Sequence, residues 1–307
     1  MITIGIDTSN YTTSVAFFDG MSGENCSRLL PVKQGELGLR QSDAVFSHTK
    51  SLPELSGRLF SHVNGEKISA VGVSTRPRAV EGSYMPCFMV GYSHGKILAD
   101  ALKVPLIEVS HQQGHVAASL WSAGRMDLMD VPHLAWHLSG GTTELLLVEP
   151  EGKNVRCTRI GGTTDISAGQ LIDRTGVMLN LPFPAGKHLD ELSKSATMTE
   201  VFMVKCPGLE FSLSGVQNKM QQFHEKHNAP AETAAYALRC VGEAVLTATK
   251  NALKQYPGHP VVFSGGVASN SMLREKLAHL APIFSEPRFS TDNAMGVAVL
   301  AARLTEE

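Results

Sequence analysis

The stretch IGIDTSNYTTSVAFF, residues 4–18, decides the fold class. Its apolar and small polar residues alternate, its side chains are often β-branched, and it is interrupted by a run of polar residues. This pattern predicts a strand, a tight turn and an antiparallel partner strand. The stretch LAWHLSGGTTELLLV, residues 134–148, has the same form around a Gly-Gly turn. The repetition predicts two related half-domains facing each other across a cleft.

The segments after each opening alternate between buried strands and helices. ISAVGVST (residues 68–75) and VPLIEVS (104–110) have the composition of buried strands, and a helical pattern lies between them. The longest helical pattern is AETAAYALRCVGEAVLTATKNALKQY, residues 231–256. Strands joined by helical crossovers pair in parallel, so we expect an α/β fold whose sheets are mixed rather than purely parallel.

The composition is that of an ordinary globular protein. Of 307 residues, 43% are apolar and 18% charged, and the net charge of -2 provides no general basic field for nucleic acid. The five cysteines are scattered and odd in number, which argues against a disulfide framework or a zinc ribbon. No signal peptide or transmembrane run is recognisable, so we expect a cytoplasmic protein that does not enter a membrane.

A pair of histidines begins the helix predicted after the strand VPLIEVS. His111 and His115 lie four positions apart in HQQGH, so both imidazoles share one helix face and could bind one cation. The alternative is two unrelated histidines on a polar face. Gln112 and Gln113 exclude a zinc protease of the H-E-x-x-H type, because neither can act as a general base. Two histidines also leave a metal short of ligands, so a carboxylate must come from elsewhere.

Asp292 is the candidate for that carboxylate. It lies in STDNAMGVAVLAA, residues 290–302, just before the last helical pattern. An aspartate at this place can equally cap the helix, since Asp is a preferred N-cap residue. As a third ligand it would complete a set of two histidines and one carboxylate that leaves coordination positions open for substrate.

Two glycine turns are candidates for anion binding. LSGGTTEL (residues 138–145) follows a strand, and FSGGVASNSML (263–273) joins a strand to a helix. Glycine lets backbone N–H groups approach a phosphate closely, although each turn alone could be purely structural. Together with DTSNYTT (residues 7–13) they resemble the way an actin-like ATPase or a sugar kinase surrounds nucleotide phosphates.

Five motifs in order resemble one family, the tRNA N6-adenosine threonylcarbamoyltransferases, formerly called O-sialoglycoprotein endopeptidases. The resemblance runs nearly from end to end. It implies acyltransferases rather than proteases, with an actin-like ATPase fold of two ribonuclease-H-like lobes. We predict an N-terminal lobe over residues 1–105, to which a C-terminal helix of about 293–307 could return, and a C-terminal lobe over 106–292 carrying the metal and nucleotide site. The motifs are HQQGH, LSGGTTEL, EFSLSGVQNK (210–219), SGGVASNSMLR (264–274) and STDNAM (290–295).

The resemblance also implies roles for individual residues. It implies metal ligands at His111, His115 and Asp292, and catalytic roles for Asp7 and Ser139. The loop implied to hold the adenylate phosphate comprises His137, Leu138, Ser139, Gly140 and Gly141. The residues implied to lie against ribose and adenine are Asp173, Gly186, Asp190 and Asn270.

The implied reaction transfers a threonylcarbamoyl group from threonylcarbamoyl-AMP to N6 of adenosine 37 in tRNA. The implied cofactor is one divalent metal ion, with Fe²⁺ favoured by the resemblance and Zn²⁺ or Mn²⁺ equally suited to the ligands. The nucleotide ligand is threonylcarbamoyl-AMP or ATP. The implied partners are tRNA, a metal-free homologous subunit and a small ATPase.

Several residues depart from the family pattern while the three metal ligands are kept. These departures leave two alternatives: a divergent paralogue that acts on another acyl- or carbamoyl-adenylate or hydrolyses ATP, and a non-catalytic regulatory subunit that holds a nucleotide. Acidic residues of the family are replaced, and basic side chains are added in two loops. HQQGH has Gln113 where the family pattern H-x-E-G-H has glutamate. The other departing residues are Thr142, Ile166, Gln170, Lys187, Arg76 and Arg78.

Overall fold

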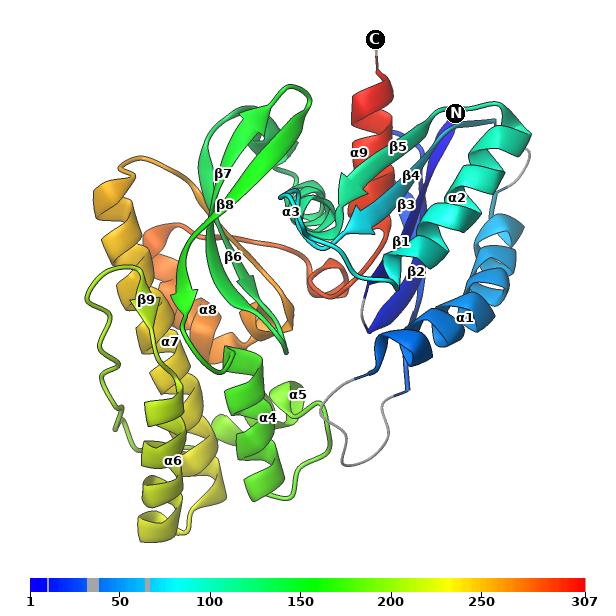
Figure 1. Cartoon of the computed structure of the whole chain (residues 1–307). Helices are drawn as coiled ribbons and strands as arrows, with labels where there is room; N and C mark the ends of the chain where they lie inside the picture. The colour runs from blue at the N-terminus through cyan, green and yellow to red at the C-terminus, as the bar shows by residue number, and fades with distance from the viewer. Residues whose placement is uncertain (10, 32–38, 64–66, 307) are drawn as a thin grey trace. The chain divides into compact units, whose positions relative to one another are not determined.

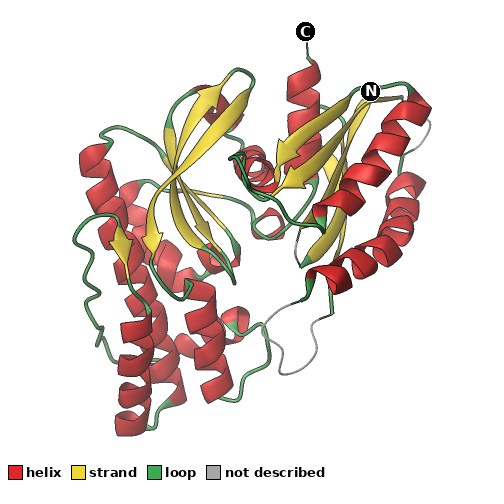
Figure 2. Cartoon of the chain, in the orientation of Figure 1, coloured by secondary structure: helices red, strands yellow, loops and turns green. Residues whose placement is uncertain are grey.

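The computed structural model describes residues 1–9, 11–31, 39–63 and 67–306. Three consecutive strands open each half of the chain, helices and further strands follow them, and the strands form two separate sheets (Figure 2). The chain divides into two compact units. Unit 1 comprises Met1–Val131, Glu149–Cys157 and Asp292–Glu307, and unit 2 comprises Pro132–Val148 and Thr158–Thr291.

Unit 1 is built on a five-stranded mixed sheet with the order β3-β2-β1-β4-β5. The first three strands pair antiparallel, whereas β4 and β5 extend the sheet in parallel from β1. This is the mixed sheet that the first stretch predicts. The strands are β1 (Ile2–Ser9), β2 (Thr12–Phe18), β3 (Gly23–Leu29), β4 (Ile68–Arg76) and β5 (Leu106–Ser110).

The helices of unit 1 cover this sheet (Figure 1). They are α1 (Gln41–Ser61), α2 (Phe88–Leu102), α3 (His111–Ser122) and α9 (Met295–Thr305), with a short 3₁₀ helix at Met126–Asp130. Helix α9 packs against β1 and crosses α3 very closely. A Cβ atom on Gly296 would lie 1.8 Å from the carbonyl oxygen of Gly114, so a larger residue at Gly296 cannot be accommodated at this crossing. The crossing fixes α3 to the segment that begins α9.

Unit 2 repeats the plan of unit 1 in its six-stranded sheet, whose order is β11-β10-β6-β7-β8-β9. The strands β8, β7, β6, β10 and β11 correspond in order to β3, β2, β1, β4 and β5. Strands β6 and β7 pair antiparallel, and β10 pairs in parallel with both β6 and β11. The strands are β6 (His133–Leu138), β7 (Thr143–Glu151), β8 (Asn154–Thr163), β9 (Glu210–Phe211), β10 (Val261–Ser264) and β11 (Ile283–Phe284).

The core of unit 2 lies between this sheet and its helices. Trp136 of β6 is fully buried, and its indole N–H donates a hydrogen bond to Thr249 Oγ1 over 2.9 Å. The helices are α4 (Ala168–Met178), α5 (Gly186–Ser193), α6 (Ser214–His227), α7 (Pro230–Gln255) and α8 (Ser271–Leu277). Three 3₁₀ turns cover Gly266–Ser269, Ala278–Leu280 and Pro287–Phe289. Within the described ranges, none of the helices in either unit has the length and hydropathy needed to cross a membrane.

The boundary between the units differs from the predicted division at residue 105. Residues 106–131 belong to unit 1, because α3 packs on α9 and on the first sheet. The tip of the β7–β8 hairpin also clusters with unit 1, where Gln113 Nε2 donates to the carbonyl oxygen of Val155 over 2.7 Å. Both candidate metal-binding histidines therefore lie in unit 1 rather than in a C-terminal lobe.

Strand β3 was not predicted from the sequence.

Candidate functional site

The two histidines are presented by a well-capped helix start. Ser110 is the N-cap of α3: its side chain accepts from the backbone N–H of Gln113, and the Gln113 side chain accepts from the backbone N–H of Ser110. This reciprocal capping box satisfies two of the backbone N–H groups that a helix start leaves unpaired. His111 is the first residue of the helix and His115 lies one turn later, so their Nε2 atoms are only 2.9 Å apart. The predicted shared helix face is confirmed.

Asp7 lies behind the first histidine. This aspartate is in β1, its side chain is 1% exposed, and one carboxylate oxygen accepts from the backbone N–H of Ser9 over 2.9 Å. The other carboxylate oxygen lies 2.8 Å from Nδ1 of His111. A carboxylate at Nδ1 orients the ring and leaves Nε2 for a ligand, as in the carboxylate–histidine pairs around metals. The geometry favours an orienting role for Asp7, and its predicted catalytic role stays a prediction.

Asp292 comes to the histidines from the far end of the sequence. Its Oδ1 atom lies 3.2 Å from His115 Nε2 and 3.6 Å from His111 Nε2. Asn25 of β3 holds this segment in place by accepting from the backbone N–H of Ala294 over 2.9 Å. Ala294, not Asp292, is the N-cap of α9. The capping alternative for Asp292 therefore does not hold, and the structure brings the three residues together.

The charges at this cluster favour a cation. Burial opposes the protonated form of His111, but the charges of Asp7 and Asp292 outweigh it and raise the pKa of His111 to about 10. Burial also opposes ionisation of the two carboxyl groups, yet the neighbouring histidines hold the pKa of Asp292 well below its usual range, and His111 lowers the pKa of Asp7. The buried Asp7 carboxylate and the partly exposed Asp292 carboxylate therefore favour positive charge beside them, which a proton on His111 or a metal ion can supply.

The donor atoms of His111, His115 and Asp292 fit a single metal ion. Ligands about 2.1 Å from a common centre lie about 3.0 Å apart at right angles and about 3.4 Å apart at tetrahedral angles. The observed separations of 2.9, 3.2 and 3.6 Å lie within about 0.2 Å of this range. Two imidazoles and one carboxylate form the set that leaves open positions on Fe²⁺ and that also suits Zn²⁺ or Mn²⁺.

In unit 2, the first glycine turn is a tight hairpin between β6 and β7. The backbone N–H of Ser139 donates to the Thr142 carbonyl over 2.8 Å, and the Thr142 N–H donates to Ser139 Oγ over 3.1 Å. Ser167, the N-cap of α4, donates its hydroxyl to the Gly140 carbonyl over 2.6 Å. Among the residues that the structure describes, no non-neighbouring atom would lie within 4 Å of a Cβ placed on Gly140 or Gly141. The Ser167 hydrogen bond therefore holds the turn on one side, and the two glycines face open space on the other.

The second glycine turn packs directly on the end of β6. Gly265 has a φ of +91°, and a Cβ there would lie 2.1 Å from the Leu138 carbonyl oxygen, so only glycine fits. Beyond this turn, Asn270 is the N-cap of α8, and its Nδ2 atom donates to Asp190 over 2.8 Å. Asp190 also accepts from the Ser271 hydroxyl over 2.7 Å. The structure therefore brings Asp190 and Asn270 together.

The remaining predicted nucleotide residues lie on α4, α5 and the end of β6. Asp173 of α4 accepts from the backbone N–H of Ala185 over 2.9 Å, directly before Gly186 begins α5. Burial raises the pKa of Asp173, although this hydrogen bond acts in the opposite direction. His137 pairs with Ser264 across β6 and β10, so it lies between the two glycine turns. We call the two glycine turns with Asp173, Asp190 and Asn270 the glycine cradle.

Comparison with known proteins assigns the family. The model of the tRNA N6-adenosine threonylcarbamoyltransferase family matches residues 37–299. The chain belongs to this family. A tRNA N6-adenosine threonylcarbamoyltransferase of Carboxydothermus hydrogenoformans is 32% identical over 313 residues, covering 97% of this chain and 90% of that protein. One of Streptococcus equi subsp. zooepidemicus is 35% identical over 258 residues, covering 79% and 72%. The prediction of an acyltransferase family rather than a protease is confirmed.

Solved structures similar to this threonylcarbamoyltransferase family member show its fold. Full-length HypF in its phosphate- and nucleotide-bound form has a TM-score of 0.62 at 15% identity, covering 100% of this chain and 47% of the longer HypF. A ROK family glucokinase from Streptomyces griseus, in complex with glucose and AMPPNP, has a TM-score of 0.54 at 11% identity and covers 99% and 100%. The predicted actin-like ATPase fold is confirmed.

Two of the departures from the threonylcarbamoyltransferase pattern have structural explanations. Gln113 stands where the family has glutamate in H-x-E-G-H, and it closes the capping box of α3. Gln170 stands where the family usually has a carboxylate, and it closes an equivalent capping box with Ser167 at the start of α4. A glutamine side chain accepts a hydrogen bond as a glutamate does. These two replacements therefore keep the capping of both helix starts.

His48 lies beside the site but was not among the residues predicted to form it. It lies on α1, is fully buried, and its Nδ1 atom is 2.8 Å from Thr13 Oγ1 in β2. Burial lowers the pKa of His48, against the charge of Asp7 and a contact with the Ser9 backbone. His48 therefore packs against strand β2, which pairs with the strand β1 that carries Asp7. The sequence signal was a histidine in an amphipathic helix, which does not distinguish a buried from a solvated position.

Proposed function

We propose that this chain transfers a threonylcarbamoyl group from threonylcarbamoyl-AMP to N6 of adenosine 37 in tRNA, in a metal-dependent reaction. The observation that carries the proposal is the convergence of His111, His115 and Asp292, with Asp7 behind His111, in a member of the threonylcarbamoyltransferase family. If these three residues only stabilised the fold, both imidazole Nε2 atoms would not need to converge beside the Asp292 carboxylate.

The reaction needs no nucleophile from the protein. The N6 amine forms a bond to the carbamoyl carbon, the bond from that carbon to the phosphate oxygen breaks, AMP leaves, and one amine proton is released. His111, His115 and Asp292 would hold a divalent metal ion, Fe²⁺ in the first instance, and that ion would supply a Lewis acid for negative charge that develops on oxygen. Asp7 keeps the His111 ring in the orientation that directs Nε2 to the metal.

The glycine cradle is the proposed nucleotide site. The uncovered faces of Gly140 and Gly141 suit an approaching phosphate, because nothing would contact even an added Cβ there. Asp190 and Asn270 provide a carboxylate and an amide for sugar or base recognition. Ser139 already accepts a hydrogen bond within its turn, which favours a role in shaping the turn over a role as nucleophile.

The decisive experiment is a reconstituted assay. Purified chain is supplied with Fe²⁺, threonylcarbamoyl-AMP, unmodified tRNA, the homologous metal-free subunit and the small ATPase that the family resemblance implies. The proposal expects threonylcarbamoyl-adenosine in digested tRNA, and no product from the His111→Ala/His115→Ala variant. Metal-loaded protein that turns over ATP with all partners present but never modifies tRNA would support the divergent paralogue instead.

A further inference from the structure

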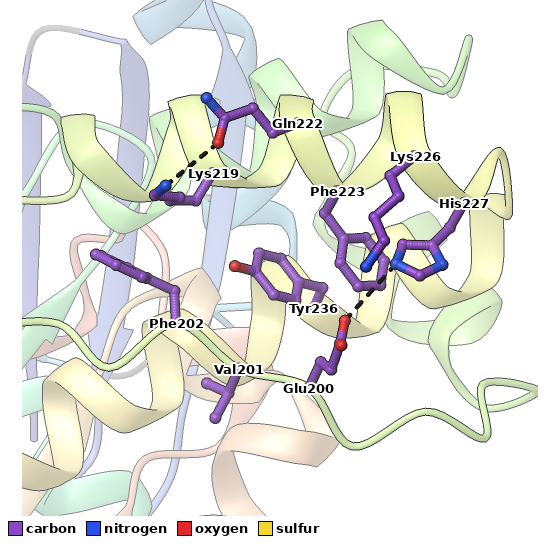
Figure 3. A pocket seen from close by; sticks show the side chains of 9 residues that line it. All are labelled: Glu200, Val201, Phe202, Lys219, Gln222, Phe223, Lys226, His227 and Tyr236. Atoms are coloured by element: carbon purple, nitrogen blue, oxygen red, sulfur yellow. Dashed lines mark hydrogen bonds and ion pairs between the residues drawn. The ribbon is translucent and has the colours of Figure 1, made fainter.

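A pocket outside the metal cluster and the glycine cradle combines aromatic rings with lysines. It has a volume of about 350 Å³ and is formed in unit 2 by α6, α7 and the segment around Glu200–Phe202 (Figure 3). None of these elements supplies a residue of the glycine cradle. The volume falls within the range of small-ligand sites, which begins at about 300 Å³. The pocket is therefore large enough for one nucleotide-sized group.

The wall of the pocket is an ordered aromatic column. The rings of Phe223 and Tyr236 stack with centroids 4.4 Å apart and an interplanar angle of 14°, and His227 lies 4.4 Å from Phe223. Figure 3 shows Tyr236 between Phe202 and Phe223, with its hydroxyl directed away from Phe223. Offset stacking of this kind fixes the rings before any ligand arrives.

Phe202 supplies an additional ring that is only half-buried. Its backbone N–H donates to Cys240 Sγ over 3.3 Å, which ties it to α7. The neighbouring Glu200 carbonyl accepts from Arg239 Nη1 over 3.2 Å. Because the backbone at Glu200 and Phe202 is anchored to α7, the half-buried Phe202 ring is held as a platform that can receive a flat group.

The charged groups at the pocket favour an anion. Lys219 and Lys226 both lie on α6, are exposed and line the pocket. Lys219 donates only to the Gln222 side-chain oxygen over 3.3 Å, and among the described residues no carboxylate pairs with Lys226. The acidic lining residue, Glu200, lies 3.7 Å from His227 Nε2. Two lysines without acidic partners remain available for phosphate.

We propose that this pocket binds a single-stranded segment of the tRNA substrate, with one base stacked on Phe202 and its flanking phosphates paired with Lys219 and Lys226. The inference rests on the proposed function, because the occupant is the RNA on which that function acts. Aromatic faces beside a lysine-lined groove are the usual means of binding unpaired nucleotides without reading their sequence. The pocket would thus add affinity for RNA and leave the chemical step to other residues.

The test measures tRNA affinity and transfer separately for the full chain with its partners. In the Lys219→Glu/Lys226→Glu variant, the Kd for tRNA should rise about tenfold or more. The slope of log Kd against log salt should fall by about 1.5, because two phosphate contacts are lost. Metal content and the rate at saturating tRNA should not change. The matched control, Lys250→Glu/Lys254→Glu on α7, reverses two exposed lysines outside the pocket and should resemble the wild type.

A second variant tests the platform. Phe202→Leu keeps an apolar side chain but removes the aromatic face, and it should weaken tRNA binding about tenfold with an unchanged salt slope. Met203→Leu, an exposed neighbour, is its control. Wild type that binds and modifies tRNA while both pocket variants match their controls would overturn only this inference. Pocket variants that lose a protein partner while their tRNA affinity is unchanged would also overturn this inference. Wild-type protein that binds no tRNA would overturn both this inference and the proposed function.

Discussion

The metal cluster of unit 1 and the glycine cradle of unit 2 occupy comparable places on two sheets with the same strand order, yet they are built by different means. In the metal cluster, side chains from distant parts of the sequence converge: Asp7 and His111 are 104 residues apart, and His115 and Asp292 are 177 apart. The glycine cradle is instead shaped mainly by close packing of backbone segments, as where Gly265 lies against Leu138.

The two sites also differ in how their carboxylates are satisfied. Asp190 and Asp173 of the cradle accept hydrogen bonds from neutral groups of the protein. Asp7 of the metal cluster also accepts from a neutral group, the Ser9 backbone N–H, but Asp7 and Asp292 both face histidines, where a proton or a metal ion can balance their charge. The metal cluster therefore favours the binding of a cation. In the glycine cradle the carboxylates already have hydrogen-bond partners, and the backbone of Gly140 and Gly141 remains accessible to a ligand. Mutations should separate the two sites.

The largest expected effect is the loss of metal from the His111→Ala/His115→Ala variant. Two of the three donor atoms disappear, so bound metal should fall from about one ion per chain to nearly none. Elemental analysis after dialysis measures this, and calorimetry with an adenine nucleotide tests the cradle separately. His188→Ala, an exposed histidine on α5, is the control. Full metal content in the double variant would refute the assignment.

Asp7→Asn should have the next largest effect on the metal cluster. The amide keeps the shape of the side chain but removes the charge that orients and polarises His111, so metal affinity should fall about 10- to 100-fold. Competition with a chelator of known affinity measures the change. Asp100→Asn, an exposed carboxylate on α2, should leave the affinity unchanged. If Asp7→Asn binds metal like the wild type while activity is lost, Asp7 acts in catalysis rather than in orientation.

The sequence predicted most of the fold because its signals are local. Alternation, glycine turns and helical spacing identified the strands and helices on both sides of each turn, and the i, i+4 spacing placed His111 beside His115. What it could not supply were contacts that depend on the tertiary fold. The role of Asp7 at His111, the support from His48, and the assignment of α3 to unit 1 all follow from helix packing across the first sheet, which leaves no local pattern.

Substitutions at two glycines of the cradle should affect stability and nucleotide binding separately. Gly265→Ala places a Cβ in a left-handed conformation and against the Leu138 carbonyl, so it should lower the free energy of unfolding by about 1–3 kcal/mol. Gly140→Ala meets nothing within 4 Å and should leave the stability nearly unchanged while weakening nucleotide binding. Urea denaturation and calorimetry measure the two quantities. Equal loss of stability in both variants would show that the first turn is also constrained by packing.

The smallest expected effect concerns acid stability at Asp165, just before α4 in unit 2. Burial opposes ionisation, but the hydroxyls of Ser212 and Ser214 and the backbone N–H groups of Leu213 and Ser214 outweigh it and lower the pKa of Asp165 to about 2. The ordinary value in an unfolded chain is about 3.9. A carboxyl whose pKa is lower in the folded state stabilises the fold above the unfolded value, and this stabilisation is lost as pH falls from about 4 to about 2.

Asp165→Asn should therefore be less stable than the wild type at pH 7, and the difference should shrink between pH 4 and pH 2. Urea denaturation at several pH values measures this, with Asp43→Asn, an exposed carboxylate of α1, as the control. Metal content should not change, because Asp165 belongs to unit 2 and the metal ligands to unit 1. A stability difference that stays constant down to pH 2 would mean that the shape of the Asp165 side chain, and not its charge, holds the start of α6.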